Sequence, residues 1–221
     1  MITGTSYNFY FLAYRSSRYF LMNSSSRRII GLTGGISTGK TTVSNYLAEK
    51  YNLSILDADI YAREAVAIDS PILKDIFSRY GDKVKLADGS LNRSALGEII
   101  FNDDTEKLWL ESQIHPYVRD RFKTRLQELK KDTIVLSIPL LFEANLTHLV
   151  TEIWVVYCHR SRQITRLQQR DRLNLQQAET RINSQLPLST KVAQADVVLD
   201  NNSDLNTLYR QIDKAIATNP S

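Results

Sequence analysis

The sequence lacks the residues on which several classes of protein depend. Its 221 residues contain a single cysteine, Cys158, which excludes a disulfide within the chain and suits a reducing compartment. This cysteine follows an apolar run at 153–157, so we expect a buried, unreactive thiol. No apolar run approaches the roughly 18 residues of a membrane-spanning helix, and His148 and His159 have no partners at the spacing of zinc ligands. We therefore expect no membrane span and no zinc site.

Acidic residues are missing from residues 1–28, whose four arginines account for the whole net charge of +4. The rest of the chain carries 24 basic and 24 acidic side chains, and a neutral folded part does not favour nucleic acid as a partner. The arginines follow a short apolar patch at 9–14, whereas a signal peptide has its charges first. A transit peptide fits the composition only loosely. We interpret residues 1–28 as a disordered extension or as the product of an upstream start, with Met22 as the natural first residue.

The strongest signal in the chain is a run at 34–41 that fits the phosphate-loop pattern G-x-x-x-x-G-K-[ST]. Glycines let successive backbone N–H groups turn inward around a phosphate. Lys40 brings an ammonium to the β- and γ-phosphates, and the Thr41 hydroxyl is a ligand for Mg²⁺. The helix predicted to follow aims its positive dipole end at the same phosphates. The predicted ATP-binding residues are Gly34, Gly35, Ile36, Ser37, Thr38, Gly39, Lys40, Thr41 and Thr42.

Other motifs of nucleotide-binding proteins are missing, and this narrows the class. None of the eight glycines has an aspartate three positions before it, so the D-x-x-G motif of GTPases is lacking. Asn-Lys-x-Asp, which recognises guanine, is lacking too. The apolar run at 134–138 ends in Pro139 and not in the Asp-Glu of motor ATPases. A small-molecule or nucleotide kinase remains.

Strand-like and helical patterns alternate along most of the chain. Five short apolar runs have the length of strands: 29–33, 53–56, 133–138, 153–157 and 196–199. Four stretches have helical periodicity: 41–51, 161–172, 176–185 and 203–217. Such alternation predicts an α/β protein with the three-layer P-loop fold, in which helices cover both faces of a parallel sheet.

The interval 59–131 breaks this alternation, because it is poor in strands and long for a simple crossover. Its periodicity predicts helices at 60–67, 71–80, 93–101 and 105–129. We interpret it as a helical domain inserted after the second strand, where a second substrate would lie near the carboxyl ends of the strands.

Three kinds of side chain are candidates for chemistry outside the phosphate loop. Asp59 leaves the second predicted strand, where a carboxylate can take a proton from an acceptor hydroxyl or simply cap the next helix. Arg162, Arg166 and Arg170 share one helix face, which is either a solvated surface or a lid that clamps phosphates. Glu143 is expected as an exposed carboxylate at a strand end.

His115 and Pro116 stand within a predicted helical run, which Pro116 should interrupt or kink. Without further information His115 is a partly buried histidine on the helical face. No residue pattern decides between this interpretation and a binding role.

Six motifs occur in an order that is typical of one family: Gly31-Leu32-Thr33-Gly34-Gly35-Ile36, Asp57-Ala58-Asp59, Ile114-His115-Pro116, Pro139-Leu140-Leu141-Phe142-Glu143, Gln169-Arg170-Asp171 and Asp200-Asn201-Asn202. Together they resemble the dephospho-coenzyme A kinases, from residue 29 to about residue 217. Ser37 and Thr38 stand where this family more often has Gly-Ser, and Thr41 replaces a serine. Both departures keep the loop small and polar.

The resemblance implies the last step of coenzyme A biosynthesis, in which ATP phosphorylates the ribose 3′-hydroxyl of dephospho-CoA to give CoA and ADP. It implies one P-loop kinase domain at 29–217 with three parts. These are a nucleotide-binding core at 29–58, 132–159 and 186–217, a helical CoA-binding insert at 59–131 and a lid at 160–185.

The resemblance also assigns roles to individual residues. Asp59 corresponds to the general base, and Lys40 and Arg170 to catalytic groups at the phosphates. The substrate-binding positions are Asp59, His115, Arg166 and Arg181. Asp200 and Asn201 correspond to the segment that helps to hold the adenine.

The same reading predicts the partners. Mg²⁺ accompanies ATP, with Thr41 as its protein ligand, and the partners are the small molecules ATP and dephospho-CoA. We expect neither nucleic acid nor a membrane, a monomer or weak homo-oligomer, and a cytoplasmic location. Two alternatives remain open. Another small-molecule or nucleoside kinase would not need the insert with His115, and a non-catalytic ATP-binding regulatory module would not need Asp59 beside Lys40.

Overall fold

The computed structural model describes residues 27–218, so nearly all of the predicted extension at 1–28 lies outside the described residues. The chain forms two compact units. We call them the sheet unit (described residues 27–55 and 131–218) and the helical unit (Leu56–Lys130). Among the described helices, none is both long enough and apolar enough to cross a membrane.

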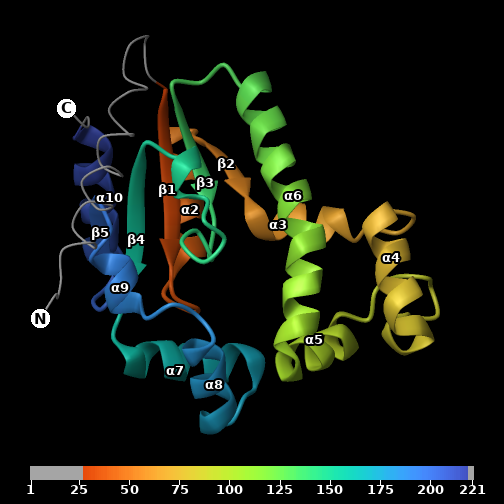
Figure 1. Ribbon diagram of the computed structural model, residues 1–221. Coiled ribbons are helices and arrows are strands. Elements are labelled where there is room, and N and C mark those ends of the chain that lie inside the picture. Colours follow the sequence, from red (N-terminus) through yellow and green to blue (C-terminus); the bar gives the residue numbers. More distant parts are fainter. Residues whose placement is uncertain (1–26, 219–221) are drawn as a thin grey trace, which may run out of the picture. The chain divides into compact units, whose positions relative to one another are not determined.

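A five-stranded parallel sheet carries the fold, in the order β2-β3-β1-β4-β5 (Figure 1). The strands are β1 (Arg28–Gly34), β2 (Ser54–Asp57), β3 (Thr133–Ser137), β4 (Glu152–Tyr157) and β5 (Val197–Asp200). Central β1 pairs with β3 through Ile30↔Val135 and with β4 through Leu32↔Trp154. All five predicted strands are thereby confirmed. The apolar runs of the three central strands suit strands covered on both faces.

The order of the strands reverses at β1. From there the chain continues to β2 and β3 on one side, and to β4 and β5 on the other. In an open parallel sheet such a switch point leaves a crevice beyond the carboxyl ends of the strands, and ligands bind there. The loop that follows β1 begins at this point.

Two helices, α2 (Lys40–Tyr51) and α10 (Leu205–Ala217), contact each other and cover one face of the sheet. Their buried Leu47 and Ile212 form one apolar cluster with Ile30 and Leu32 of β1. Each such side chain stabilises the fold by about 1.5–3 kcal/mol when it is removed from water. The phosphate loop and its helix therefore rest on the main core of the sheet unit.

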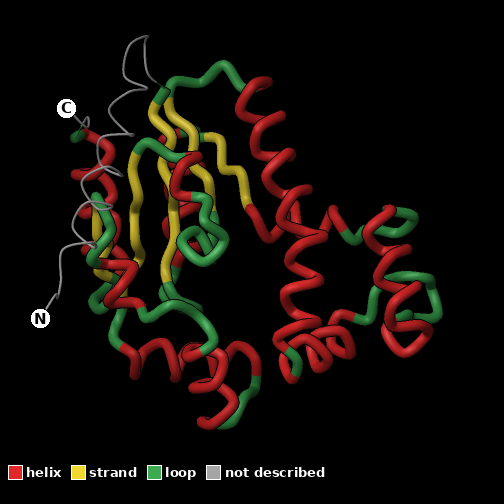
Figure 2. Tube along the Cα trace, in the orientation of Figure 1, coloured by secondary structure: helices red, strands yellow, loops and turns green. Residues whose placement is uncertain are grey.

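The opposite face of β1 is covered by the segment that follows β3 and includes the short helix η2 (Thr147–Leu149), which lies in front of the sheet in Figure 2. Gly31 allows this close approach. A Cβ at this position would lie 2.9 Å from Val150 Cγ1 and 3.2 Å from Leu141 Cδ2. A glycine is needed here because two segments of chain meet at van der Waals distance.

A helical hairpin and a short helix lie between β4 and β5. The hairpin consists of α7 (Arg160–Asp171) and α8 (Leu175–Asn183). Arg172 ends α7 in the left-handed conformation, and Asn174 with Gln177 forms a capping box at the start of α8. The short α9 (Leu188–Val192) was not predicted, because five residues after a proline carry too little periodicity to be recognised.

The helical unit contains α3 (Ala58–Ala65), α4 (Pro71–Tyr80), the short η1 (Gly81–Val84), α5 (Arg93–Asn102) and α6 (Asp104–Glu128). The side chains of Ser70, Asn92 and Asp103 cap α4, α5 and α6 by accepting backbone N–H groups. Their buried residues form a separate apolar cluster that includes Leu73, Ile76 and Leu110. The four predicted helices of the insert are confirmed.

Helix α6 continues through Pro116, so the predicted interruption is wrong. An interior proline removes the hydrogen bond to the carbonyl four residues earlier and its ring crowds that carbonyl, yet this 25-residue helix continues on both sides of Pro116. At its first turn Glu106 accepts two hydrogen bonds from Arg79 and one from Tyr80, which tie α6 to α4. The Arg79 bonds lower the pKa of Glu106 to about 2.

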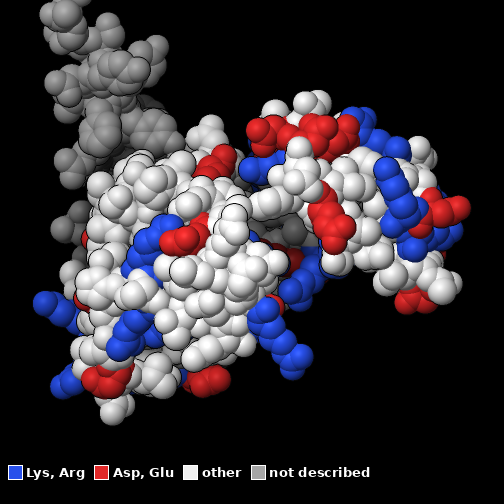
Figure 3. Space-filling view, turned by 90° about the horizontal axis from the view of Figure 1, so that it is seen from below, with Lys and Arg blue, Asp and Glu red and all other residues white. Residues whose placement is uncertain are grey.

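Charged side chains of both signs are interspersed over the described surface that Figure 3 shows. One ion pair belongs instead to the interior. Arg28, which the prediction places in the extension, is the first residue of β1 and pairs with Glu152 at the start of β4. Its guanidinium also donates to the carbonyls of Ala215 and Ile216. This pair fixes α10 against the amino end of the sheet.

Candidate active site

The loop between β1 and α2 has the backbone geometry of a phosphate cradle. Ser37 has a φ of 59° and Gly39 a φ of 106°, both in the left-handed region. Such residues interspersed with ordinary ones turn successive N–H groups toward one point, where an anion binds. The Ser37 hydroxyl is buried and has no hydrogen-bond partner among the described residues.

Two side-chain hydrogen bonds stabilise this loop, one from the distant Asn201 and one within the loop. The buried Asn201 donates from Nδ2 to the carbonyl of Thr38 at 2.8 Å, and the Thr38 hydroxyl donates to the carbonyl of Gly35 at 2.9 Å. A Cβ on Gly39 would lie 2.2 Å from Asn201 Nδ2, so the site requires glycine on steric as well as conformational grounds. Contacts within the protein therefore support this conformation of the loop.

Lys40 and Thr41 occupy the first turn of α2. The Lys40 ammonium donates to the hydroxyl of Ser137, a buried residue at the end of the neighbouring strand β3. Thr41 is exposed, and its hydroxyl has no partner among the described residues. Mg²⁺ prefers oxygen ligands and retains several waters, so one exposed hydroxyl beside a phosphate cradle fits this ion. No cluster of three histidine, cysteine or carboxylate side chains suited to a metal occurs among the described residues.

The arginines of the hairpin fall into two groups. Arg166 reaches the loop, with nitrogens 3.3 Å from the carbonyl of Thr38 and 3.4 Å from that of Asn201. Arg170 instead forms a bidentate pair with Asp171, and Arg181 of α8 contacts the same carboxylate at 2.9 Å. These contacts, the Arg170 hydrogen bond foremost, lower the pKa of Asp171. Of Arg166, Arg170 and Arg181, Arg166 is the one that contacts the phosphate loop.

The segment after β5 closes the site at its other side. Asp200 accepts from the backbone and the side chain of Asn202 and so shapes the turn. The side chain of Asn201 is turned inward to Thr38, as described above. Nearby Cys158 is buried, as expected, and burial raises the pKa of its thiol. A thiol with a raised pKa stays protonated and is a poor nucleophile.

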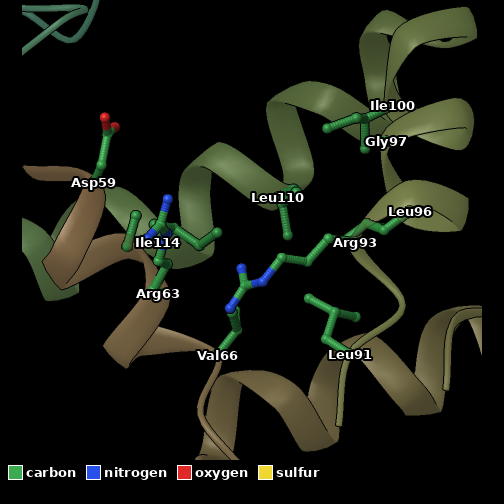
Figure 4. Close-up of a pocket in the computed structure, with 11 residues that line it drawn as sticks. Asp59, Arg63, Val66, Leu91, Arg93, Leu96, Gly97, Ile100, Leu110 and Ile114 are labelled. Atoms are coloured by element: carbon green, nitrogen blue, oxygen red, sulfur yellow. The ribbon is translucent and has the colours of Figure 1, made fainter. Parts of the chain in front are cut away.

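The helical unit contains a pocket of about 290 Å³ between α3, α5 and α6 (Figure 4). Its walls are largely aliphatic and come from Val66, Leu91, Leu96, Ile100, Leu110 and Ile114. Three charged side chains also line it: Asp59, Arg63 and Arg93. In Figure 4 the Arg93 side chain extends across the pocket toward Val66, and the Asp59 carboxylate points away from the aliphatic wall.

The two pocket arginines differ from Arg79, Arg121 and Arg125 of the same unit, which each pair with a glutamate. Neither Arg63 nor Arg93 has a hydrogen bond or ion pair among the described residues. A guanidinium has five donors in a fixed fork that matches a phosphate or carboxylate. The pocket therefore combines an apolar wall with two donors that are available to an anionic group.

Asp59 is not the cap of the helix that follows β2. Helix α3 begins at Ala58, and the Asp57 carboxylate accepts the N–H of Asp59 at 2.8 Å. The alternative role considered for Asp59 is therefore wrong, because the helix starts two residues earlier than that role requires. Asp59 is exposed, in the first turn of α3. His115 is half-buried on α6, next to the pocket residue Ile114.

Sequence reasoning missed several residues of the site. Gln163, Gln185 and Lys191 contact the loop or its support, yet they lie far from it in the sequence. Glu143, which was expected as an exposed carboxylate, is an exposed residue; its side chain is 20% exposed and pairs with Lys191. One signal was available for Arg63, since Asp59 and Arg63 are four residues apart and so share a helix face.

A phosphate cradle on the central strand of a parallel sheet, an arginine-bearing hairpin and a pocketed helical unit define a P-loop kinase. The chain belongs to the dephospho-CoA kinase family, whose family model matches residues 28–207. A relative from Trichormus variabilis named dephospho-CoA kinase is 60% identical over 191 residues, which covers 86% of this chain and 97% of the relative. The resemblance inferred from the motifs is thereby confirmed.

Solved structures agree with this assignment. A crystal structure from Thermus thermophilus has a TM-score of 0.76 at 29% identity, covering 87% of this chain and 97% of that chain. A dephospho-CoA kinase from Campylobacter jejuni has a TM-score of 0.64 at 28% identity, covering 86% and 95%. The predicted α/β fold class is confirmed.

Proposed function

We propose that this protein transfers the γ-phosphoryl group of ATP to the ribose 3′-hydroxyl of dephospho-CoA, giving CoA and ADP. The observation that carries the proposal is the family match over residues 28–207, within which the phosphate loop at 34–41 has every fixed position filled. The reaction would be the last step of coenzyme A biosynthesis. No observation on the described residues favours a second function.

The donor side of the reaction is assigned to the sheet unit. Backbone N–H groups of the phosphate loop would bind the β-phosphate, and the Lys40 ammonium would bind the β- and γ-phosphates in place of the Ser137 hydroxyl. Thr41 would hold Mg²⁺ together with phosphate oxygens, and this ion would offset the charge that develops on the leaving oxygen. Asp200 and Asn201 are proposed to border the adenine, with Asn201 acting through the Thr38 carbonyl that it binds.

The acceptor side is assigned to the helical unit. Asp59 is proposed as the general base: its carboxylate takes the proton of the 3′-hydroxyl as the oxygen attacks the γ-phosphorus and the bond to ADP breaks. Its exposed position in the first turn of α3 supports this role.

The pocket of the helical unit suits the rest of the acceptor. Dephospho-CoA joins an adenosine to a long arm through a diphosphate, and the arm is largely aliphatic and amide in character. We assign the diphosphate to Arg63 and Arg93, since these are the pocket arginines without a protein partner. The aliphatic wall would cover part of the arm. His115 is proposed as a further contact to the acceptor.

The hairpin at 160–185 is proposed as the lid. Arg166 would contact the phosphates from its position on the loop, and Arg170 and Arg181 would exchange Asp171 for phosphate oxygens as the lid closes. We also propose a cytoplasmic protein that is a monomer or weak homo-oligomer.

An acceptor assay tests the proposal directly. The purified chain is incubated with ATP and Mg²⁺, and ADP release is followed with dephospho-CoA, with shikimate, with nucleosides and with no acceptor. We expect release only with dephospho-CoA and a product heavier by one phosphoryl group. A 3′-deoxy analogue of dephospho-CoA should not react. Transfer to this analogue would contradict the assigned hydroxyl, and release with another acceptor alone would contradict the function.

A further inference from the structure

Lys191 on α9 is a lysine whose side chain is completely buried. Its ammonium lies 2.8 Å from Glu143 Oε1 and donates to the carbonyl of Pro139 at 3.1 Å. Removing an ammonium from water is costly, and the attraction to one carboxylate often fails to offset that cost. Apolar residues of the same volume frequently stabilise a fold as well or better. Stability alone is therefore a weak reason for a lysine at this position.

The partners of Lys191 connect it to the phosphate loop by two routes. Glu143 Oε1 also accepts the N–H of Leu186 at 3.0 Å, which fixes the chain just beyond the hairpin. The carbonyl of Pro139 also accepts the hydroxyl of Thr33 at 3.0 Å. Thr33 is fully buried and immediately precedes the first glycine of the loop. One ammonium thus joins the exit of the hairpin to the entrance of the loop.

Side chains at the two ends of the hairpin form hydrogen bonds with one residue of the loop, Ile36. Gln185, adjacent to Leu186, accepts the N–H of Ile36 through Oε1 at 2.9 Å. The buried Gln163, in the first turn of α7, donates from Nε2 to the carbonyl of Ile36 at 2.8 Å. The N–H and the carbonyl of Ile36 are therefore bonded to side chains at the two ends of the hairpin.

We propose that Lys191 and Glu143 are positioning residues for phosphoryl transfer. They hold residues 185–186 in place, so that the side-chain carbonyl of Gln185 accepts the N–H of Ile36. The arginines of the hairpin then move about a fixed point at its end. Neither residue contacts substrate in this account, which rests on the proposed kinase function. Phosphoryl transfer depends almost entirely on positioning and electrostatics, so a displaced pivot should lower turnover more than nucleotide affinity.

The test uses Lys191→Met, Glu143→Gln and the double variant in the full chain. Methionine fills the space of the lysine, and glutamine keeps an acceptor for the Leu186 N–H. The matched control is Glu152→Gln, which breaks a second buried ion pair of the same unit at the opposite end of the sheet. For each variant kcat, the KM for ATP and the melting temperature are measured at temperatures where the protein is folded.

We expect each single variant to lower kcat at least tenfold with less than a threefold change in the KM for ATP. The double variant should be no slower than the slower single variant, because the two residues act as one unit. Glu152→Gln should lower the melting temperature and leave kcat within twofold. A kcat within twofold of wild type for both single variants would overturn the proposal.

Hydrogen–deuterium exchange separates this proposal from the proposed function. Amides at 34–37 and 184–186 should exchange faster in Lys191→Met than in wild type, and at wild-type rates in Glu152→Gln. If the wild-type chain shows no transfer to dephospho-CoA, the kinase proposal fails, and the exchange result alone tests whether Lys191 and Glu143 hold the hairpin and the loop. Unchanged exchange in both segments would then overturn this positioning role.

Discussion

The sheet unit and the helical unit bury different kinds of side chain. The polar or charged side chains that are buried among the described residues all belong to the sheet unit: Thr33, Thr38, Ser44, Ser137, Thr147, Glu152, Gln163, Lys191 and Asn201. Among described residues 56–130 the buried side chains are aliphatic or aromatic. A buried polar group must have partners with defined geometry and so fixes the backbone around it. The sheet unit is built to hold one loop in one conformation.

The helical unit solves a different problem. Its aliphatic core leaves a pocket whose arginines, Arg63 and Arg93, have no partner among the described residues. A donor phosphate presents the same groups in every P-loop protein, whereas the acceptor differs from one kinase to the next. In the proposed function, the buried polar contacts of the sheet unit would serve the donor and the pocket of the helical unit would serve the acceptor.

The largest effect is expected for the donor side. Lys40→Ala should abolish detectable transfer and weaken ATP binding while the fold is retained, because no other side chain in the loop offsets the charge on the β- and γ-phosphates. Turnover and ATP binding by calorimetry check this. Lys50→Ala on the same helix, which loses a surface pair with Asp213, is the control and should keep turnover. Near wild-type transfer by Lys40→Ala would mean that the loop is not the donor site.

The lid should show a smaller but still large effect. Arg170→Ala is expected to lower kcat about 10²–10³-fold and the ATP affinity much less, because its contacts would strengthen as charge moves to the leaving oxygen. Steady-state kinetics with varied ATP separates the two. Arg160→Ala, on the same helix and bonded to Asn183, is the matched control. A loss below threefold would return Arg170 to a solvated surface role beside Asp171.

The acceptor side should respond in a different parameter. Arg93→Ala is expected to raise the KM for dephospho-CoA about 10–100-fold, since a hydrogen bond to a charged group contributes about 1.5–3 kcal/mol. The KM for ATP should stay within twofold. Arg79→Ala in the same unit, whose guanidinium pairs with Glu106, should lower stability instead. An equal rise in both KM values for Arg93→Ala would contradict the assignment of ATP to the sheet unit and of dephospho-CoA to the helical unit.

The smallest effect concerns the conformation of the loop. Ser37→Gly should raise the melting temperature by about 1–4 °C. A non-glycine residue in the left-handed region costs about 1–2 kcal/mol, and glycine removes this cost. Part of the gain is offset because glycine loses more conformational entropy on folding. Calorimetry of wild type and variant checks this. Asn52→Gly, also at positive φ, should gain less since asparagine tolerates this conformation. A lower melting temperature for Ser37→Gly would show that the buried hydroxyl stabilises the loop.

The sequence predicts what is encoded locally. The phosphate loop, the five strands and the helices of the insert follow from spacing and periodicity within short windows. The supports of the loop do not, because Asn201 and Gln163 reach Thr38 and Ile36 only when the sheet brings together segments more than 120 residues apart. Asp57 and Asp59 are chemically alike, so the sequence could not decide which one caps α3. Helix α9 is too short to have a period, and Lys191 on it gave no sign of burial.

In the proposed function, the helical unit binds the acceptor dephospho-CoA and contributes the general base Asp59. Asp59→Asn tests it most directly, since asparagine has nearly the same shape but cannot take the 3′-hydroxyl proton. A base contributes about 10²–10⁴-fold to such reactions. Asp57→Asn is the matched control, because asparagine caps helices as well as aspartate does and should keep turnover within threefold.

The measurement is single-turnover transfer to dephospho-CoA at saturating substrates, with calorimetric binding of ATP and of dephospho-CoA to the same samples. The account predicts that transfer by Asp59→Asn falls by about 10²–10⁴-fold while both substrates bind and the melting temperature is little changed. Transfer at the wild-type rate, or a loss matched by unfolding, would contradict it.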